Sequence, residues 1–492
     1  MSSPQPSAPP PSSAPSERSS VLRSPRLWLG TGAILAAVST LFALLYVGGN
    51  VNPKGNLRDL PVALVNNDRG ADSGGKRVNF GEQVVAGIQK SPAANRSISW
   101  QVLSREEADK RLGQGKLYGA LVVPEDFTTS VSALTAPPAQ AQGQAQGQAQ
   151  GQAHGQTQAK PQAPGQTQGQ APAQPQGQGQ AQPQPVRPKL TVLTNQSAGS
   201  FGSSMASQAT QQAAHAASAQ LGKELLSRVS AQGAAAAQLP PAAKLMLADP
   251  AAVEVADGHP VGARSAMGLS AFYYALVLLV CGMLGANVIT SQVDNALGYL
   301  HTDYGPIRRR TPVRHTSRVR TLAISTVLML GLSVVMGSLV EATTVGLLDM
   351  DASHLGLLWL YSVATIAVVG ISGLALLAAF GTPGMLVSTI VFIAMAVPSS
   401  GATVPLEALP GVFRTLAEFE PLRQLTGGLR SILYYGAQGD AGLTRAWAAM
   451  GIALAASLVF GFGTTRLYDR RGLHRIPQPA QSPDAAAAPA AA

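Results

Sequence analysis

Long uncharged apolar segments alternate with polar segments along this chain of 492 residues. A bilayer core about 30 Å thick needs about 20 apolar helical residues to cross it. Segments of that length predict membrane-spanning helices at 27–47, 268–290, 321–340 and 446–465. The first segment is longer than the apolar part of a signal peptide and lacks a clear A-x-A site, which favours an uncleaved anchor over a cleaved signal.

One uncharged segment, 355–406, is too long for a single span. The cluster GTPG at 381–384 interrupts it, and a helix stops before such a cluster because glycine and proline disfavour its continuation. Two helices are therefore predicted there, at 355–379 and 384–400. The predicted fold class is a polytopic α-helical membrane protein with six transmembrane helices, of which the second to sixth form a membrane domain at 266–465.

Arginines gather on one side of this arrangement, as expected for cytoplasmic segments of membrane proteins. They flank the first and last spans, whereas the loop after the third span carries Glu341, Asp349 and Asp351 and no basic residue. The loop between the second and third spans holds Arg308, Arg309, Arg310, Arg314, Arg318 and Arg320. The asymmetry predicts a multi-pass protein of the cell membrane with both termini in the cytoplasm.

The same orientation divides the rest of the chain. The polar ends, 1–26 and 466–492, are predicted to be disordered cytoplasmic segments. Two further segments, 48–265 and 401–444, are predicted to lie outside the cell.

The larger external segment predicts an α/β domain inserted between the first and second transmembrane helices. Apolar or alternating segments at 61–65, 98–102 and 118–123 predict strands, and helical periodicity lies between them, so the order is βαβαβ. A fourth strand is predicted at 190–194, followed by a long helix at 200–236.

A Gln/Ala/Gly/Pro tract at 136–188 interrupts this domain. It has almost no charge and no large apolar residue, so it cannot bury enough surface to offset the entropy of ordering. We interpret it as an expanded, tolerated loop; a cell-wall spacer or interaction tether is the alternative.

Composition and motifs exclude several classes of function. The net charge is +10, but the basic residues flank apolar segments rather than one soluble face, so nucleic acid is not an expected partner. No P-loop, H-E-x-x-H or G-x-S-x-G motif occurs, and no enzyme activity or cofactor is predicted. Cys281 is the single cysteine. The loop containing Asp68 and Asp72 is typical of a polar turn, with a calcium site as the less favoured alternative.

Two surfaces remain as candidate sites. The inner arginine loop at 308–320 predicts a docking surface for a cytoplasmic partner such as an ATPase subunit, and the alternative is an orientation signal that also contacts anionic lipid. Outside, two apolar stripes separated by Pro421 predict two short amphipathic helices at the membrane interface. The stripes comprise Phe413, Leu416, Phe419, Leu422, Leu425, Leu429 and Leu433.

The external segment also carries a family resemblance. LPVALVNNDRG at 60–70, NFG at 79–81 and SREEADKRLGQGKLYGALVVPEDF at 104–127 resemble the YhgE/Pip family, also called phage infection protein. HPVG at 259–262 and VPLEALP at 404–410 are similar to ABC-2 type permeases and to the nitrosoguanidine-resistance family, DUF3533. The chain lacks the extended coiled-coil stalk of long YhgE/Pip members.

The resemblance implies a permease-like subunit that exports lipophilic or toxic compounds, or envelope components, as a homodimer gated by a separate ATPase. The alternative is a non-transporting scaffold or receptor of the cell envelope whose external domain binds a partner. The lipid bilayer is a partner in both.

The predicted topology can be tested with single cysteines. Gln144→Cys is expected to react with a membrane-impermeant maleimide in intact cells, because the arginine asymmetry places it outside. Gly305→Cys is expected to react only after lysis. The parent chain, whose Cys281 lies in an apolar segment, is the control. The opposite labelling pattern would overturn the orientation.

Overall fold

The protein was analysed as a computed structural model that describes residues 52–73, 76–90, 97–135, 187–231, 241–299, 302–304, 307–309, 312–396, 400–473 and 475, with positions 29, 33, 36, 37, 40 and 44. The predicted span at 27–47, the terminus at 1–26 and the tract at 136–188 lie wholly or mostly outside these residues.

The segment predicted to be external forms a five-stranded sheet in the order β4-β1-β5-β6-β7. Strand β1 is parallel to both of its neighbours, β5 and β6 are antiparallel, and β6 and β7 are parallel. The strands are β1 (Leu60–Asn66), β4 (Ile98–Val102), β5 (Gly119–Val123), β6 (Lys189–Thr194) and β7 (Ala252–Asp257). The first four coincide with the strands that the apolar pattern predicts.

Strand β7 was not predicted from the sequence. It reads AVEVAD, and its burial pattern shows no fully buried position because it is the edge strand. Two acidic residues interrupt its apolar residues, so it lacks the continuous apolar run that marks the central strands.

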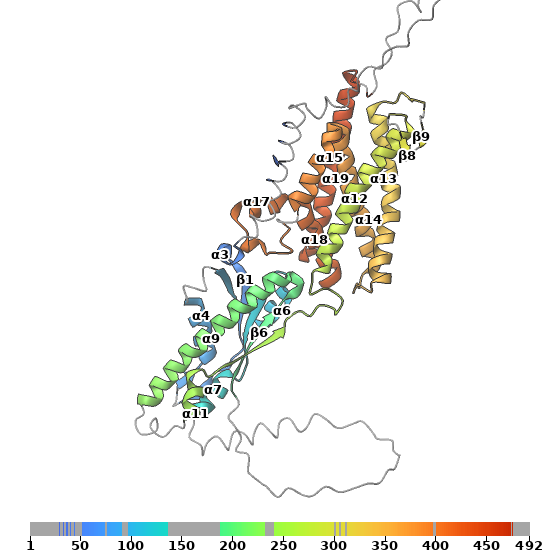
Figure 1. The fold of residues 1–492 in the computed structure, drawn as a ribbon. Helices are drawn as coiled ribbons and strands as arrows, with labels where there is room; N and C mark the ends of the chain where they lie inside the picture. Colours follow the sequence, from blue (N-terminus) through green and yellow to red (C-terminus); the bar gives the residue numbers. More distant parts are fainter. Residues whose placement is uncertain are drawn as a thin grey trace, which may run out of the picture.

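Helices cover both faces of this sheet. Helices α4 (Phe80–Lys90), α7 (Phe127–Thr135) and α9 (Ser200–Ala231) bury one face in a cluster that includes Leu64 and Leu121, and α6 (Arg105–Leu112) buries the other with Ala63 and Val122. The shorter elements are α3 (Pro53–Asn56), β2 (Ala71–Ser73), β3 (Lys76–Val78), η1 (Gln196–Ala198) and α11 (Pro241–Ala248). The result is an α/β region in which α9 lies across the sheet (Figure 1).

A buried carboxylate joins the loops at one end of the sheet. Asp68 is 8% exposed, and its Oδ1 accepts hydrogen bonds from the backbone N–H groups of Gly70 (3.2 Å) and Thr128 (3.0 Å). Its Oδ2 accepts from the N–H of Gly81 (3.0 Å) and from the Thr128 hydroxyl. Both oxygens are therefore used in structural hydrogen bonds, as a polar turn requires.

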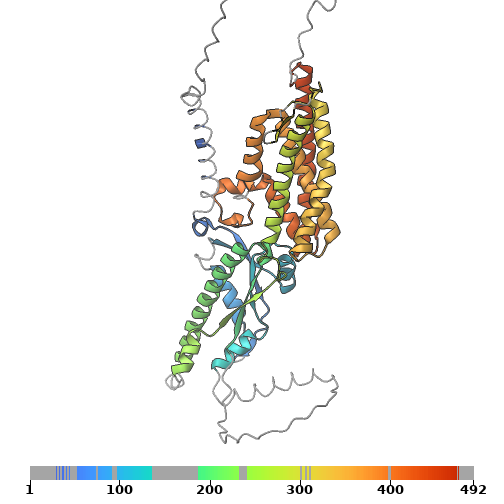
Figure 2. The same cartoon turned by 45° about the vertical axis from the view of Figure 1, so that its right-hand side comes forward.

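Four helices of the described chain are long and apolar enough to cross a membrane. They are α12 (Ser270–Ala296), α13 (Arg318–Glu341, extended by the π-helical turn η2 at Ala342–Leu347), α14 (Leu355–Phe380) and α19 (Leu443–Arg470). The described chain is mostly helical. The long helices form a bundle that contacts one end of the α/β region (Figures 1 and 2).

Each of these helices is longer than the span predicted for it, and the structure corrects the prediction in two details. Helix α12 continues to Ala296 and so includes Asp294, and α19 continues to Arg470, so the first residues of the predicted disordered terminus are helical. Helix α14 ends at Phe380, before Gly381 at φ 65°, which agrees with the predicted break.

The segment predicted as a span at 384–400 begins as a shorter apolar helix. Helix α15 (Thr382–Thr389) continues into the π-helical η3 (Ile390–Ala394). At 1.5 Å per residue these elements cover about 20 Å, less than a bilayer core of about 30 Å.

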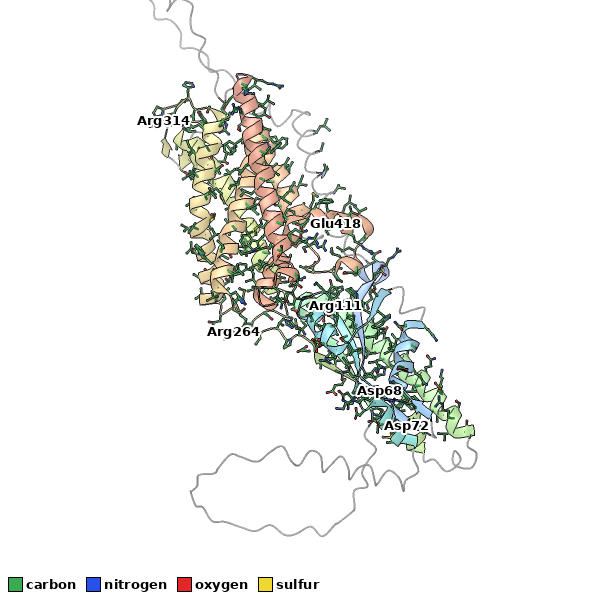
Figure 3. All side chains as sticks on the ribbon, turned by 180° about the vertical axis from the view of Figure 1, so that it is seen from behind. Asp68, Asp72, Arg111, Arg264, Arg314 and Glu418 are labelled. Carbon is green, nitrogen blue, oxygen red and sulfur yellow. The ribbon has the colours of Figure 1, made fainter. Side chains whose placement is uncertain are left out.

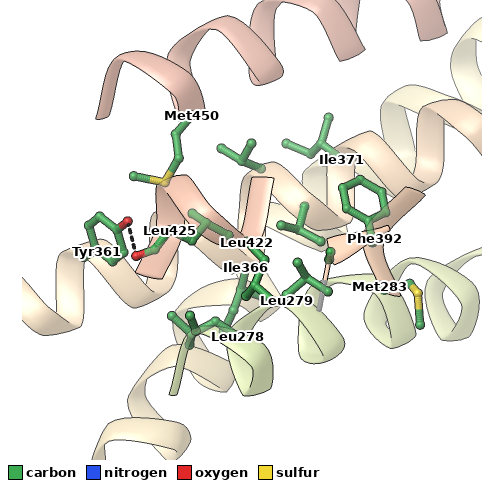
Figure 4. Packing of buried hydrophobic residues seen from close by; sticks show 14 of the residues in the cluster. Leu278, Leu279, Met283, Tyr361, Ile366, Ile371, Phe392, Leu422, Leu425 and Met450 are labelled. Carbon is green, nitrogen blue, oxygen red and sulfur yellow. Dashed lines mark hydrogen bonds between the residues drawn. The ribbon is translucent and has the colours of Figure 1, made fainter. Parts of the chain in front are cut away.

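The bundle packs around α14. Its core combines residues of α12, α14, α18 (Pro421–Tyr434) and α19, and Figure 4 shows part of it. Half of the apolar stretch of α12 and of α14 is buried, against 22% for α13 and 17% for α19. Helices α13 and α19 therefore present broad apolar faces to their surroundings.

Replacing Asp68 by asparagine is expected to destabilise the α/β region by about 2 kcal/mol, since the new amide N–H₂ would face N–H or O–H donors and leave buried groups unpaired. Thermal unfolding of the purified chain, followed by protease resistance of this region, measures the loss. Asp72→Asn, at an exposed position of β2, is the matched control and should behave as wild type. Equal stability of the two variants would contradict the proposed role of Asp68.

Candidate functional site

A helical hairpin connects the bundle with the α/β region. It consists of α17 (Gly411–Phe419) and α18, joined at Glu420, and η4 (Leu406–Ala408) precedes it. The Pro421 break predicted from the sequence separates the two helices. The segment returns to the bundle through η5 (Gly439–Ala441) and α19.

The two stripes of the hairpin have different surroundings. Leu422, Leu425 and Leu429 are at most 4% exposed and belong to the bundle core, and Leu433 packs against it. Helix α18 is therefore inserted among the bundle helices, and its predicted place at the membrane interface stays a prediction. Tyr361 of α14 donates a hydrogen bond to the Leu425 carbonyl oxygen (3.0 Å), which ties α18 to α14 (Figure 4).

The α17 stripe is less buried than the α18 stripe. Phe419 is 80% exposed, Leu416 is half-buried, and Phe413 packs against the cluster that joins the hairpin to the α/β region.

An apolar cluster forms the centre of the junction between the α/β region and the hairpin segment. Leu60 and Ile98 at the start of the sheet and Met205 of α9 belong to one buried cluster with Val404 and Leu409. Backbone hydrogen bonds support this contact, because the Arg58 N–H donates to the Glu407 carbonyl oxygen (2.9 Å).

Polar contacts surround this cluster. The Gln114 amide donates to the Asp440 carboxylate (2.7 Å), and Lys116 forms an ion pair with the same carboxylate (3.6 Å). The Arg264 guanidinium pairs with Asp349 at 2.6 Å. Arg264 lies where the α/β region meets the bundle (Figure 3).

Tyr434, at the end of α18, ties three segments together. Its hydroxyl lies 2.7 Å from the Ser270 hydroxyl and accepts a hydrogen bond from the Ala271 N–H (3.2 Å), at the start of α12. Its carbonyl oxygen accepts from His259 Nε2 (2.9 Å), which follows β7. A shift of α18 would therefore move both the bundle and the α/β region.

Charged groups are buried at the same junction. Burial, with repulsion from the Glu407 carboxylate, raises the pKa of the Tyr118 hydroxyl, whereas Arg430 opposes the rise. Burial also raises the pKa of Glu407, which accepts a 3.4 Å hydrogen bond from Tyr118. Nε and Nη2 of Arg430 are buried and find no acceptor among the described residues. Such desolvated charges are costly to bury and mark the junction as a functional candidate.

Glu420, at the tip of the hairpin, is a further buried carboxylate. It is 3% exposed and caps α18, accepting 2.6 Å hydrogen bonds from the N–H groups of Leu422 and Arg423. The hydrogen bonds favour the ionised carboxylate, but burial outweighs them and raises the pKa of Glu420 to about 8.

The predicted arginine loop lies at the opposite end of the bundle. Strands β8 (Thr302–Tyr304) and β9 (Ile307–Arg309) form a hairpin, with Arg308 paired to Asp303 in the backbone register. Arg309 ends β9, and Arg310 lies outside the described residues. Arg314 is exposed near this hairpin, far from the α/β region (Figure 3).

Arg318 differs from its neighbours in the loop. Its Nε donates to the Leu473 carbonyl oxygen (2.7 Å), and its guanidinium lies 5.2 Å from the Tyr468 ring centroid. Asp469 accepts the backbone N–H groups of Arg318 (2.9 Å) and Val319 (3.0 Å), which caps α13. Arg318 thus joins α13 to the end of α19, whereas Arg314 and Arg320 are exposed.

Asp294 and Arg475 form an ion pair at the same end of the bundle, and the sequence did not predict this pair. Asp294 is buried in the last turn of α12, and Arg475 follows α19 by five positions. Single charges far apart in a chain carry no pairing signal. Among the described residues, no group of three or more His, Cys, Asp or Glu side chains is placed to hold a metal ion.

Four membrane-length helices with an appended α/β region indicate a polytopic helical membrane protein. The chain belongs to the family described as protein of unknown function DUF3533, which matches residues 31–149 and 170–453. That part of the resemblance is confirmed, and the YhgE/Pip and ABC-2 permease parts stay predictions. No curated protein and no solved structure matches the chain.

Two arginines of one helical turn allow the inner contacts to be tested. Arg318→Gln is expected to lower the stability of the bundle by about 1 kcal/mol, because the charged hydrogen bond to Leu473 and the contact with Tyr468 are lost. Arg320→Gln should leave it unchanged, since its exposed side chain has no partner in the described part of the chain. Thermal unfolding in detergent, followed by tryptophan fluorescence, compares the two. A neutral Arg318→Gln would show that Arg318 does not join the helices.

Proposed function

We propose that this chain is the membrane component of an exporter of lipophilic or toxic compounds or of envelope components. In this proposal the chain crosses the cell membrane six times. The four long helices provide four of the crossings, and the segments 27–47 and the one that begins with α15 provide the other two. Both termini lie in the cytoplasm, and the α/β region lies outside.

The observation that carries the proposal is the position of α18. It packs within the bundle against α12, α14 and α19, and its last residue bonds to His259 and Ser270 outside the bundle core. Movement of the bundle helices would therefore reach the α/β region directly. In this proposal the link couples the α/β region to the rocking of helices that alternating access involves.

The inner end supports an ATP-driven mechanism with a separate ATPase. The β8–β9 hairpin carries Arg308 and Arg309, and Arg314 and Arg320 are exposed in the segment that follows it along the chain. Arginine clusters bind carboxylates bidentately and suit a docking surface for an acidic partner. Arg318 is not included in this surface because its guanidinium is engaged by Leu473 and Tyr468.

The outward apolar faces of α13 and α19 support a homodimer within the bilayer, with either face as the contact. Lipid occupies the remainder. Small residues on α19, including Gly451 and Gly463, leave open space on this side of the helix.

A cleavable crosslink across the junction tests export. Gln114→Cys and Asp440→Cys, in a Cys281→Ala chain, place thiols where a hydrogen bond joins the two side chains, and a short cleavable thiol crosslinker bridges them. Cells that produce the chain are expected to resist a panel of lipophilic toxic compounds. Crosslinking should abolish most of this resistance, and cleavage should restore it, since a fixed junction prevents movement of α18.

The single-cysteine chains, treated in the same way, are the controls and should keep their resistance. If the chain confers no resistance, or if the crosslinked chain protects as well as the open one, the exporter proposal is wrong. A static scaffold or receptor would behave in the second way.

A further inference from the structure

A basic cavity lies where the segment after α3 meets the start of α17. Its volume is about 190 Å³. The residues that line it are Asn56, Arg58, Leu409, Pro410, Gly411 and Arg414. Arg58 precedes β1, whereas Arg414 is the fourth residue of α17, so two cations far apart in the chain face one space. Among the described residues that line the cavity, none is acidic.

The two guanidinium groups have no counter-charge in this cavity. Arg414 Nε donates to the Leu409 carbonyl oxygen (2.9 Å), and its Nη2 lies 3.2 Å from two further carbonyl oxygens. These acceptors hold the guanidinium in place without cancelling its charge. Arg58 is exposed, and in the described part of the chain neither arginine forms an ion pair. The Glu407 carboxyl group interacts with Arg414, but it accepts from Tyr118 and does not line the cavity.

The start of α17 adds backbone donors to the same space. The first N–H groups of a helix have no intrahelical acceptor, and the helix dipole places partial positive charge there. The residue before α17 is Pro410, which makes no side-chain capping hydrogen bond, and Gly411 lines the cavity. The first turn of α17 holds no acidic residue. Together with the two arginines, these groups favour an anion with several acceptor oxygens, such as a phosphate.

An apolar stripe leads away from the cavity along α17. Val412, Leu416 and Phe419 recur at helical spacing, and Val412 is 79% exposed, as much as Phe419. Phe413 packs in the other direction, against the cluster that joins the hairpin to the α/β region. Because Val412 directly follows Gly411, the stripe begins at the cavity. A molecule that fits both features has an anionic head and a hydrocarbon tail.

The cavity is tied closely to helices predicted to cross the membrane. Helix α17 continues through Glu420 into α18, whose Leu422 belongs to the bundle core. On the other side, Asn56 follows the end of the predicted 27–47 span by nine positions. Helices α3 and α17 lie beside the end of the bundle that meets the α/β region (Figure 1). These connections hold the cavity near the level expected for phospholipid headgroups.

We propose that Arg58, Arg414 and the first N–H groups of α17 bind the phosphate of an anionic phospholipid, and that the stripe of Val412, Leu416 and Phe419 receives one of its acyl chains. Arg414 is already held in position by carbonyl oxygens, and the exposed Arg58 completes the contact with the phosphate. A zwitterionic lipid fits less well, because its cationic choline group meets the two arginines. Lipid binding at this site does not rest on the proposed export.

Lipid binding to the purified full-length chain in detergent tests the site. The probe is phosphatidylglycerol, phosphatidylcholine with the same acyl chains is the control lipid, and native mass spectrometry counts the bound lipids. Arg58→Gln is expected to weaken phosphatidylglycerol binding about fivefold, since one cationic contact near the membrane surface is lost. Its phosphatidylcholine binding should not change, and Arg58→Lys should keep most of the phosphatidylglycerol binding. Lys54→Gln removes an exposed cation of α3 outside the cavity and should bind as wild type.

Two further measurements separate the lipid from a free anion. Phe419→Ser should weaken phosphatidylglycerol binding, and inorganic phosphate should not displace the lipid. A phosphatidylglycerol with a photoreactive acyl chain should label peptides of α17 in the wild-type chain, and less in Arg58→Gln. If inorganic phosphate displaces the lipid, the cavity is a site for free phosphate and the lipid proposal is wrong. It is also wrong if α17 is not labelled, if Arg58→Gln binds as wild type, or if that variant loses both lipids equally.

Discussion

The close approach of three helices around Gly428 is the constraint on which the arrangement of this protein depends. A Cβ at this position of α18 would lie 2.4 Å from the Tyr361 hydroxyl of α14 and 2.7 Å from the Ala446 Cβ of α19. Lipid chains are as apolar as leucine, so helices in a bilayer associate through close packing and hydrogen bonds rather than through the hydrophobic effect. Glycine permits that packing here, and the Tyr361 hydrogen bond to Leu425 directs it. Because α18 is held in the bundle, its last residue, Tyr434, reaches the groups that connect the bundle to the α/β region.

Polar interactions of the bundle are divided between its interior and its ends. Inside, hydroxyl groups pair with one another, as Tyr274 does with Ser362 (2.9 Å) and Ser372 with Ser457 (2.7 Å). Charged groups lie at the ends, where water or a second charge offsets the cost of desolvation. The end of the bundle at the α/β region buries charges, and the opposite end pairs Asp294 with Arg475. A functional site at either end therefore has charge available, whereas hydroxyl groups and apolar side chains predominate among the described residues in the middle of the bundle.

The buried charges at the junction between the α/β region and the hairpin lower stability and restrict how the two parts fit together. Glu407 and Arg430 are both desolvated there, and two nitrogens of Arg430 lack an acceptor in the part of the chain that the structure describes. Apolar residues of similar volume would pack there at lower cost. We infer that the retained charges restrict the α/β region to one position on the hairpin.

The sequence by itself determined the local elements. Apolar segments of membrane length predicted α12, α13, α14 and α19, and alternating or buried patterns predicted the first four strands of the sheet, because these signals depend only on neighbouring residues. The break at Gly381 and the division at Pro421 were visible for the same reason, since glycine and proline act on the local backbone. Tertiary structure alone decided that α18 enters the bundle, that Arg318 is engaged while Arg320 is exposed, and that Asp294 meets Arg475. Those outcomes depend on contacts between residues far apart in the chain, and neither periodicity nor composition specifies which distant partners come together.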